Sequence, residues 1–353
     1  MKIVLFCKRR PMGKDLMTRP YGRFYYLAKY LSESGHDVCM FLFSYKKNEN
    51  ETVVIDQLMM RSISIYPDYV FGRSNLREYL IQINPDWLIA CSDTYFGILA
   101  AYYSSVTNSK VMIDAYDNYE SYLPYAKPVH WLWHRAIKKC DLLTVAGPSL
   151  AKLMGKYRDN NNIHIFQMAA DPQIQKADQL ESRRKLGLPL EPKLIGYHGS
   201  ITSSRGINTL FSIIESINVD SIKFVLCGKT EKGISIPKQA SYLGYLPDDD
   251  VNNFINSMDM LLVINKQSAF GNYSHPVKLY EAMSCNKPVI ASRTDSTNWI
   301  LADYPELLLD TDDIQQFSKR ILELINLGEK EYTALPSWKR LVTAVESKLI
   351  ENL

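Results

Sequence analysis

The sequence has no apolar run long enough to cross a membrane as a helix. Its apolar stretches fall well short of the roughly 20 residues that a bilayer requires. Residues 1–7 are apolar over too short a distance to form a secretory signal, and Lys8, Arg9 and Arg10 follow at once. We therefore expect a cytoplasmic protein whose first residues form a buried strand.

Closely spaced cysteine pairs and an early glycine-rich turn are also missing. The first apolar segment is followed by Cys7-Lys8-Arg9 and not by Gly-x-Gly-x-x-Gly, which argues against an NAD-dependent oxidoreductase. The six cysteines lie far apart, mostly in apolar segments, without the spacing of metal or redox sites. We expect all six to be reduced and buried: Cys7, Cys39, Cys91, Cys140, Cys227 and Cys285.

The net charge of +3 hides a difference between the two halves. Residues 1–170 carry a net charge of +6, and the remaining residues carry −3. This bias is too small to predict nucleic-acid binding, but a basic half suits an anionic membrane surface. Residues 130–139, with two tryptophans among basic residues, suit the same surface, although a half-buried helix with a solvated basic edge is the simpler interpretation. Further basic residues gather near the start of the chain: Lys8, Arg9, Arg10, Lys14, Arg19 and Arg23.

Short apolar segments alternate with segments of helical periodicity, a pattern that predicts parallel sheets covered by helices. Such segments recur up to residue 166, and the series restarts at residue 193 after a polar stretch over residues 172–192. We predict two doubly wound, Rossmann-like α/β domains, over residues 1–170 and 191–335, with ligands at the carboxyl ends of the strands. An amphipathic helix is expected over residues 336–353.

Residues 274–291 (SHPVKLYEAMSCNKPVIA) carry the strongest chemical signal. Proline suits the first position of a helix, and Asn286 suits the left-handed residue that ends one. The helix N-terminus would attract a diphosphate, and Lys278 adds a positive charge there. Glu281, one turn later, can accept hydrogen bonds from two vicinal hydroxyls. An equally simple interpretation is a surface helix on which Lys278 and Glu281 form an ion pair.

This stretch resembles the donor site of glycosyltransferases of the GT-B fold, particularly glycosyltransferase family 4. Members carry Pro-x-Lys-Leu-Tyr-Glu, a helix and then Gly-Lys-Pro-Val; here Asn286 replaces that glycine. The resemblance implies two domains facing a cleft, with the helix over residues 336–353 crossing back to the first domain. It also implies that Glu281 binds the ribose of a nucleotide-diphosphate sugar, in a nucleotide site that includes Pro276, Val277 and Leu279.

A glycine loop at residues 199–206 (GSITSSRG) lies between an apolar segment and a predicted helix, as in a phosphate-binding turn. In the family, the second position is often arginine and the seventh lysine, and both touch the donor diphosphate. Ser200 and Arg205 stand there in this chain, so one charge is lost and one is kept. The resemblance places Gly199, Ser200 and Arg205 at the diphosphate. A solvated arginine at a helix start is the alternative.

Weaker resemblances assign further positions. Gly228 and Leu243 lie in two loops that would enclose the base through main-chain contacts. Gly22 lies in a loop expected beside the acceptor and the diphosphate, where Arg23 could assist; a simple helix cap is the alternative.

Residues 114–120 follow a predicted strand at the edge expected to bind ligands. Many relatives have histidine where Tyr116 stands, next to the aspartate that matches Asp117. We predict catalytic roles for both residues, with Asp117 orienting an acceptor hydroxyl or taking its proton. The alternative is that Asp117 caps the local backbone.

Tyr273 stands eight residues before Glu281, where family 4 has a glutamate that touches the transferred sugar. A tyrosine can donate a hydrogen bond to a sugar hydroxyl, but it supplies no negative charge. We still expect the anomeric configuration of the donor to be retained.

The leading prediction is transfer of a sugar from a nucleotide-diphosphate sugar to a saccharide or lipid-linked saccharide acceptor, in the assembly of a bacterial-type surface polysaccharide or glycolipid. Arg205 and Lys278 would stabilise the leaving diphosphate, so we expect no metal or other cofactor. Residues 248–250, three aspartates, are interpreted as a helix cap and not as a metal site. The alternatives are a nucleotide-sugar epimerase or hydrolase of the same fold, or a two-lobed sugar-nucleotide binding protein.

Overall fold

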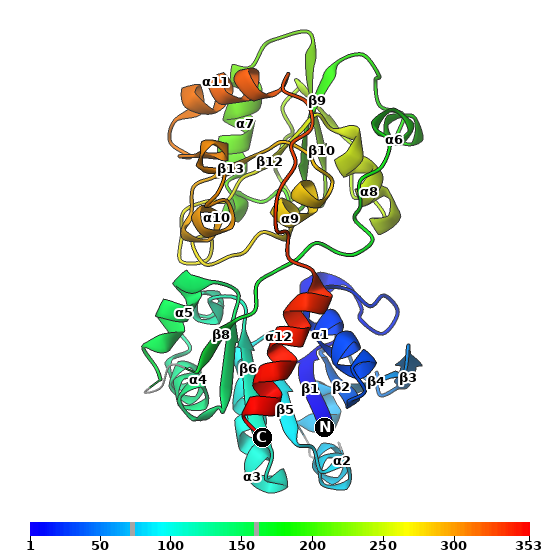
Figure 1. The fold of residues 1–353 in the computed structure, drawn as a ribbon, viewed down its shortest axis with the longest axis vertical. Coiled ribbons are helices and arrows are strands. Elements are labelled where there is room, and N and C mark those ends of the chain that lie inside the picture. The colour runs from blue at the N-terminus through cyan, green and yellow to red at the C-terminus, as the bar shows by residue number, and fades with distance from the viewer. Residues whose placement is uncertain (71–74, 159–161) are drawn as a thin grey trace. The chain divides into compact units, whose positions relative to one another are not determined.

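The computed structural model describes residues 1–70, 75–158 and 162–353, which form two compact units (Figure 1). The N-terminal unit contains residues 1–167 and 338–353, and the C-terminal unit contains residues 168–337. Residues 172–192, expected to separate the domains, belong to the C-terminal unit and include helix α6, Gln179–Lys185. Arg183 fixes this helix, because its buried guanidinium donates to the Ser257 carbonyl at 2.9 Å and pairs with Asp259 at 2.6 Å.

The N-terminal unit is built on an eight-stranded sheet of order β3-β4-β2-β1-β5-β6-β7-β8. Every neighbouring pair is parallel except β3 and β4, so the expectation of a wholly parallel sheet is wrong at this edge. Asp56 and Gln57 join these two strands with φ of 50° and 68°, as a tight hairpin turn requires. The strands are β1 (Lys2–Lys8), β2 (Asp37–Ser44), β3 (Thr52–Ile55), β4 (Leu58–Ser64), β5 (Trp87–Ala90), β6 (Lys110–Ala115), β7 (Leu142–Val145) and β8 (Ile163–Ile165).

The helices of this unit are α1 (Gly22–Glu33), α2 (Leu76–Ile83), α3 (Thr94–Thr107), α4 (Lys127–Lys139), α5 (Pro148–Gly155) and α12 (Trp338–Glu351). Helix α12 packs on α1, as Figure 1 shows. The Trp338 ring stacks on Tyr26 with centroids 5.6 Å apart, and Glu346 lies 2.9 Å from the His36 ring. The last helix of the chain therefore completes the first unit.

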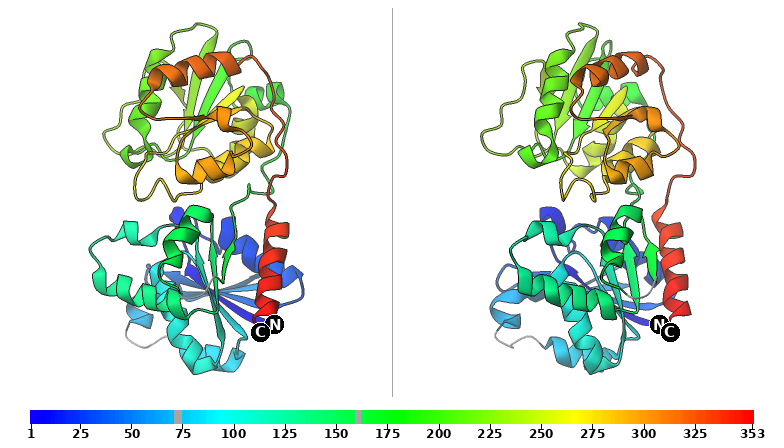
Figure 2. Two further views of the ribbon diagram at one scale, coloured as in Figure 1. Left: turned by 60° about the vertical axis from the view of Figure 1, so that its left-hand side comes forward. Right: turned by 90° about the vertical axis from the view of Figure 1, so that its left-hand side faces the viewer.

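The C-terminal unit contains a wholly parallel six-stranded sheet of order β11-β10-β9-β12-β13-β14. Helices cover both of its faces (Figure 2), and a separate cluster of apolar side chains fills each of the two layers. The strands are β9 (Lys193–His198), β10 (Ile222–Cys227), β11 (Ala240–Tyr242), β12 (Met260–Val263), β13 (Val289–Ser292) and β14 (Leu308–Leu309). Besides α6, the helices are α7 (Ile207–Ser216), α8 (Asp248–Ser257), α9 (Val277–Ser284), α10 (Asp295–Ile300) and α11 (Ile314–Leu324).

Helix α9 begins and ends close to where the sequence predicts. The sequence predicts Pro276 at the first helical position, but Pro276 is the N-cap residue. The helix therefore begins one residue later, at Val277. Asn286 has φ of 55°, and the amides of Asn286 and Lys287 donate to the carbonyls of Met283 and Ala282, which is a Schellman motif. The left-handed cap at Asn286 is thus confirmed.

Two smaller predictions have different outcomes. The residue that caps α8 is Pro247, so the expectation that an aspartate caps this helix is wrong. Residues 248–250 instead form its first turn, where negative charge interacts favourably with the helix dipole.

The six cysteines are all free and buried, as expected.

Candidate functional site

The loops after β9 and β10 meet at two glycines. Gly228 has φ of 134°, and a Cβ added there would lie 1.9 Å from the Gly199 carbonyl oxygen. Gly199 has φ of 119°, and a Cβ there would lie 1.8 Å from the Nζ of Lys278. Gly228 therefore requires glycine because the two backbones touch, and Gly199 requires it because its φ is one that other residues rarely adopt.

Lys278, in the first turn of α9, extends over this junction. Its ammonium lies 4.8 Å from the centre of the Tyr197 ring, which also packs beneath the glycine loop. Burial and the nearby Arg205 guanidinium lower the pKa of Lys278 to about 8. This ammonium is therefore in an environment that disfavours a positive charge, and an anion would stabilise it.

Arg205 lies near the far end of the same glycine loop that begins at Gly199, and its charge acts on Lys278. It is the last residue of the short 3-10 helix Ser203–Arg205, and its guanidinium lies 4.7 Å from the centre of the Phe270 ring. Within the described parts of the chain, neither Arg205 nor Lys278 forms an ion pair. Two cations thus converge near the N-terminus of α9 with no ion pair of their own in the described residues, which is the arrangement of an anion site.

Glu281 is held by a partner that the sequence analysis missed. His198, the last residue of β9, lies 2.9 Å from one Glu281 oxygen through its Nε2, and its exposed fraction is 7%. No ion pair links Lys278 and Glu281, which was the alternative interpretation of α9; among the described residues, the partner of the Glu281 carboxylate is the His198 ring. A histidine at the carboxyl end of a parallel strand was a signal that could have identified this residue.

We call Tyr197, His198, Gly199, Arg205, Lys278 and Glu281 the β9–α9 cluster. It brings together predicted residues that are up to 82 positions apart in the sequence. Ser200 follows it directly; its side chain is exposed, and its carbonyl accepts a hydrogen bond from the Tyr197 hydroxyl at 3.0 Å. The cluster therefore presents two cations, one oriented carboxylate and a glycine loop at the carboxyl end of β9.

Not all predicted nucleotide contacts fit this geometry. Leu279 is fully buried in the core of the unit, so a contact of its side chain with the nucleotide does not fit; its amide donates to the Pro276 carbonyl, and a main-chain contact stays a prediction. The Leu243 amide donates to the Leu226 carbonyl at 2.9 Å and so is not available to a base; a contact through the Leu243 carbonyl stays a prediction. Pro276 and Val277 are half-buried at the start of α9, where main-chain contacts to a nucleotide are sterically reasonable.

Tyr273 lies in the tight turn that precedes α9. Its amide donates to the Phe270 carbonyl at 3.2 Å, and its side chain is half-buried. Because Phe270 underlies Arg205, one turn carries both the support of the arginine and Tyr273. The contact of Tyr273 with the donor stays a prediction.

The remaining predicted site residues belong to the N-terminal unit. Gly22 begins α1 with φ of 72°, a conformation that favours glycine. Arg23 is buried, forms two hydrogen bonds to Asp114 at 2.7 and 2.8 Å, and lies 4.0 Å from the centre of the Phe166 ring. The expectation that Arg23 assists at a diphosphate is therefore wrong, because its charge is already neutralised inside the fold.

Tyr116 and Asp117 follow β6 and are largely enclosed. The Tyr116 ring packs edge-on against Phe24 of α1 with centroids 5.3 Å apart, and burial raises the pKa of its phenol. Asp117 has 5% of its surface exposed and accepts hydrogen bonds from the Tyr122 hydroxyl at 2.6 Å and the Asn118 amide at 3.0 Å. These are the local bonds that the capping interpretation of Asp117 anticipates.

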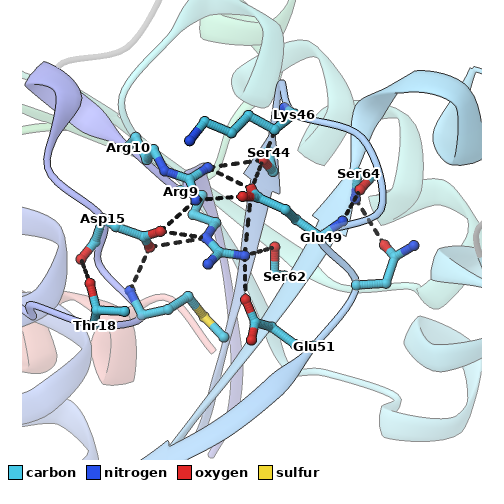
Figure 3. A network of polar contacts seen from close by, with 12 residues as sticks. Arg9, Arg10, Asp15, Thr18, Ser44, Lys46, Glu49, Glu51, Ser62 and Ser64 are labelled. Atoms are coloured by element: carbon cyan, nitrogen blue, oxygen red, sulfur yellow. Dashed lines mark hydrogen bonds and ion pairs between the residues drawn. The ribbon is translucent and has the colours of Figure 1, made fainter.

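The basic cluster near the start of the chain is largely compensated (Figure 3). Arg9 pairs with Asp15 at 2.9 Å and with Glu51 at 2.7 Å. Arg10 pairs with Glu49 at 2.6 Å, and this hydrogen bond holds the pKa of Glu49 at about 2. Arg23 is paired as well, so the expectation of an anion-binding surface is wrong for these three arginines; for Lys8, Lys14 and Arg19 it stays a prediction.

Over residues 1–70, 75–158 and 162–353, no helix has the length and apolar character to span a bilayer. In the same residues, no three or more His, Cys, Asp or Glu side chains are grouped as a metal site would require.

Residues 178–335, which contain the whole β9–α9 cluster, match the family model described as glycosyl transferases group 1. The uncharacterised glycosyltransferase MJ1178 of Methanocaldococcus jannaschii is 30% identical over 171 residues, which cover 44% of this chain and 47% of that protein. TuaC of Bacillus subtilis, a glycosyltransferase whose name assigns it to teichuronic acid biosynthesis, is 25% identical over 57% of this chain and 51% of its own length. The chain spans about half the length of the curated relatives it matches. These matches support the prediction that the chain is an enzyme of the glycosyltransferase class.

Solved structures confirm the fold over nearly the whole chain. Sucrose-phosphate synthase from Thermosynechococcus elongatus superposes with a TM-score of 0.74 at 15% identity, covering 99% of this chain and 97% of that one. Alr3699/HepE of Anabaena, solved in complex with UDP, gives a TM-score of 0.73 at 12% identity, covering 100% and 97%. The chain therefore has the GT-B fold of two α/β domains.

Proposed function

We propose that the protein transfers a sugar from a nucleotide-diphosphate sugar to a hydroxyl of a saccharide or lipid-linked saccharide. The observation that carries this proposal is the β9–α9 cluster, where Arg205 and Lys278 converge on one glycine loop and Glu281 is held one turn further along α9. Two cations that share no counter-ion suit a diphosphate, and an oriented carboxylate suits the two hydroxyls of a ribose.

The same residues suggest how the bond is broken. In this mechanism the bond between the anomeric carbon and the diphosphate oxygen breaks, and the charge that develops on that oxygen is stabilised by Arg205, Lys278 and the N-terminus of α9. The acceptor oxygen forms the new bond, and its proton passes to the leaving diphosphate or to Asp117. Because two side chains supply the positive charge, we propose that transfer needs no metal.

We also propose that the reaction retains the anomeric configuration and serves the assembly of a surface polysaccharide or glycolipid. The similarity to TuaC, named for the biosynthesis of such a polymer, supports the second part. Tyr273 supplies no carboxylate at its position in the sequence, which suits a route in which the oxygens of the leaving diphosphate stabilise the positive charge that develops at the anomeric carbon.

A panel of UDP-, GDP- and ADP-sugars tests the proposal, first by thermal stabilisation and then by turnover. A donor should raise the unfolding temperature by mass action. With a candidate acceptor and EDTA present, the nucleoside diphosphate should appear together with a glycosylated product, and proton NMR of the fresh product should show the anomer of the donor. Nucleotide release at the same rate without acceptor would assign the protein as a hydrolase instead, and an inverted anomer would refute retention.

A further inference from the structure

The carboxyl end of β12 lies beside that of β9, yet no residue that follows β12 has a role in the β9–α9 cluster. In the sheet order β11-β10-β9-β12-β13-β14, the chain runs outward from β9 on one side and outward from β12 on the other. The boundary between β9 and β12 is therefore a topological switch point, where open α/β sheets bind their ligands. Leu261 pairs with Gly196, so β12 ends at the same level as β9. The residues after β12 therefore lie at the same edge of the sheet as the glycine loop.

Asn265, the second residue after β12, is a buried asparagine whose side-chain nitrogen has no partner. Its exposed fraction is 6%, and its Nδ2 forms no hydrogen bond within residues 1–70, 75–158 and 162–353. Its backbone is fixed, because its N–H donates to the Ser292 hydroxyl at 2.7 Å. A Cβ added at Gly206, the residue after Arg205, would lie 3.5 Å from the carbonyl carbon of Asn265. The backbone of Asn265 therefore contacts the end of the glycine loop.

The loop that follows brings a second unpartnered side-chain atom close to the first. A Cβ added at Gly271 would lie 1.9 Å from the Lys266 carbonyl oxygen, so the two ends of this loop touch. Asn272 follows Gly271, and its Oδ1 is buried and accepts no hydrogen bond in the parts of the chain that the structure describes. Its N–H donates to the Ser268 carbonyl at 3.0 Å, and its carbonyl accepts from the Ser296 hydroxyl at 2.9 Å. An unpartnered donor and an unpartnered acceptor thus lie on neighbouring stretches of fixed backbone.

Unpartnered buried atoms of this kind are not explained by a structural role. A buried polar atom without a hydrogen bond destabilises the fold, and most such atoms in proteins are paired. Asn256, in the same unit, is fully buried and shows the usual case, because its Nδ2 donates to the carbonyls of Gln175 and Asn252, both at 2.9 Å. Nδ2 of Asn265 and Oδ1 of Asn272 make no such bond. They can therefore turn toward a ligand without breaking a hydrogen bond inside the protein.

We propose that Asn265 and Asn272 bind one hydroxyl of the transferred sugar, with Nδ2 of Asn265 donating to it and Oδ1 of Asn272 accepting from it. A hydroxyl both donates and accepts, whereas an ionised phosphate oxygen only accepts and would leave the Asn272 oxygen unpartnered. The order of the strands agrees with this assignment. The base is predicted at Gly228, on the β10 side of β9, and β12 lies on the opposite side of β9. The inference rests on the proposed transfer reaction, because it names a contact to the donor of that reaction.

Calorimetry tests the proposal by comparing nucleoside diphosphates with their sugar conjugates. UDP, ADP and GDP are titrated beside UDP-glucose, UDP-galactose, UDP-N-acetylglucosamine, ADP-glucose and GDP-mannose, and the tightest sugar nucleotide is kept with its parent. Asn265→Leu and Asn272→Leu keep the approximate size of each side chain and remove its amide group. Each should bind the sugar nucleotide about 2- to 13-fold more weakly and the parent diphosphate as before, since one neutral hydrogen bond is lost. Asn265→Ala should show the same selective loss.

Thermal unfolding of the ligand-free proteins separates ligand binding from a structural role. Asn265→Leu should keep or raise the unfolding temperature, because it removes a buried unpartnered group. The matched control Asn256→Leu removes an asparagine whose bonds are made, so it should lower the unfolding temperature and leave the affinity for the sugar nucleotide unchanged.

Three results would overturn the proposal while the proposed function stands. They are wild-type affinity for the sugar nucleotide in Asn265→Leu or Asn272→Leu, equal losses of affinity for the sugar nucleotide and its parent, and a fall in unfolding temperature in Asn265→Leu as large as that in Asn256→Leu. A wild-type protein that binds none of these nucleotides would refute the proposed function and this inference together.

Discussion

Replacing Glu281 with alanine should remove the recognition of ribose and leave the recognition of diphosphate. In the β9–α9 cluster, His198 engages one carboxylate oxygen of Glu281 at 2.9 Å. In the part of the chain that the structure describes, no hydrogen bond or ion pair engages the other oxygen. A hydrogen bond to a charged group contributes about 1.5–3 kcal/mol, so one such bond to a ribose hydroxyl corresponds to roughly a 10- to 150-fold loss of affinity in Glu281→Ala.

Calorimetry with modified nucleotides makes this prediction specific. UDP, GDP and ADP are titrated first, and the 2′,3′-dideoxy form of the tightest binder is then compared with the parent nucleotide. The wild-type protein should prefer the parent nucleotide by the factor given above, whereas Glu281→Ala should bind both forms alike. The preference of His198→Ala for the parent nucleotide should lie between those of the wild-type protein and Glu281→Ala, because the carboxylate remains but loses its orientation. If folded Glu281→Ala still discriminates between the two nucleotides, the assignment of Glu281 to the ribose is wrong.

Three further predictions concern charge and chemistry. Arg205→Ala and Lys278→Ala should each lower the affinity for a nucleoside diphosphate at least tenfold in calorimetry and leave the affinity for the nucleoside unchanged, since the proposed partner of both cations is phosphate. Equal losses of affinity for both ligands would contradict these roles. Because the pKa of Lys278 is lowered to about 8, its ammonium is lost as the pH rises above that value. Diphosphate affinity should therefore fall between pH 7 and pH 9, with proton uptake on binding near pH 8, and a flat pH profile in the wild-type protein would refute this reasoning. Tyr273→Phe should lower kcat only modestly, whereas Asp117→Asn should lower it strongly if Asp117 contacts the acceptor; full activity of Asp117→Asn would restrict Asp117 to its bonds with Tyr122 and Asn118.

Features that depend on neighbouring residues could be predicted from the sequence. The buried strands follow from runs of apolar residues, and the end of α9 follows from an asparagine before Lys287 and Pro288, because both signals are local. The hairpin of β3 and β4 was missed. Its turn, Asp56-Gln57, lacks the glycine that usually marks this conformation.

Features that depend on pairing between distant residues could not be predicted. Arg23 is 91 positions from Asp114, and His198 is 83 positions from Glu281, so no pattern along the chain links them. The sequence alone does not show whether a basic residue is paired with a carboxylate, as Arg23 and Arg10 are, or is available to bind an anion, as proposed for Arg205. Burial decides between these cases, and burial is a property of the three-dimensional structure.

The packing of α12 on α1 also has a consequence for the order of events during synthesis. Tyr26 and His36 are synthesised well before their partners Trp338 and Glu346, because the whole C-terminal unit lies between them in the sequence. At 5–20 residues per second, the intervening C-terminal unit takes on the order of 10 to 30 s to appear. During that interval the first unit exposes the apolar side of α1. A stop codon after residue 337 should accordingly leave the C-terminal unit intact and make the N-terminal unit the target of chaperones and proteases.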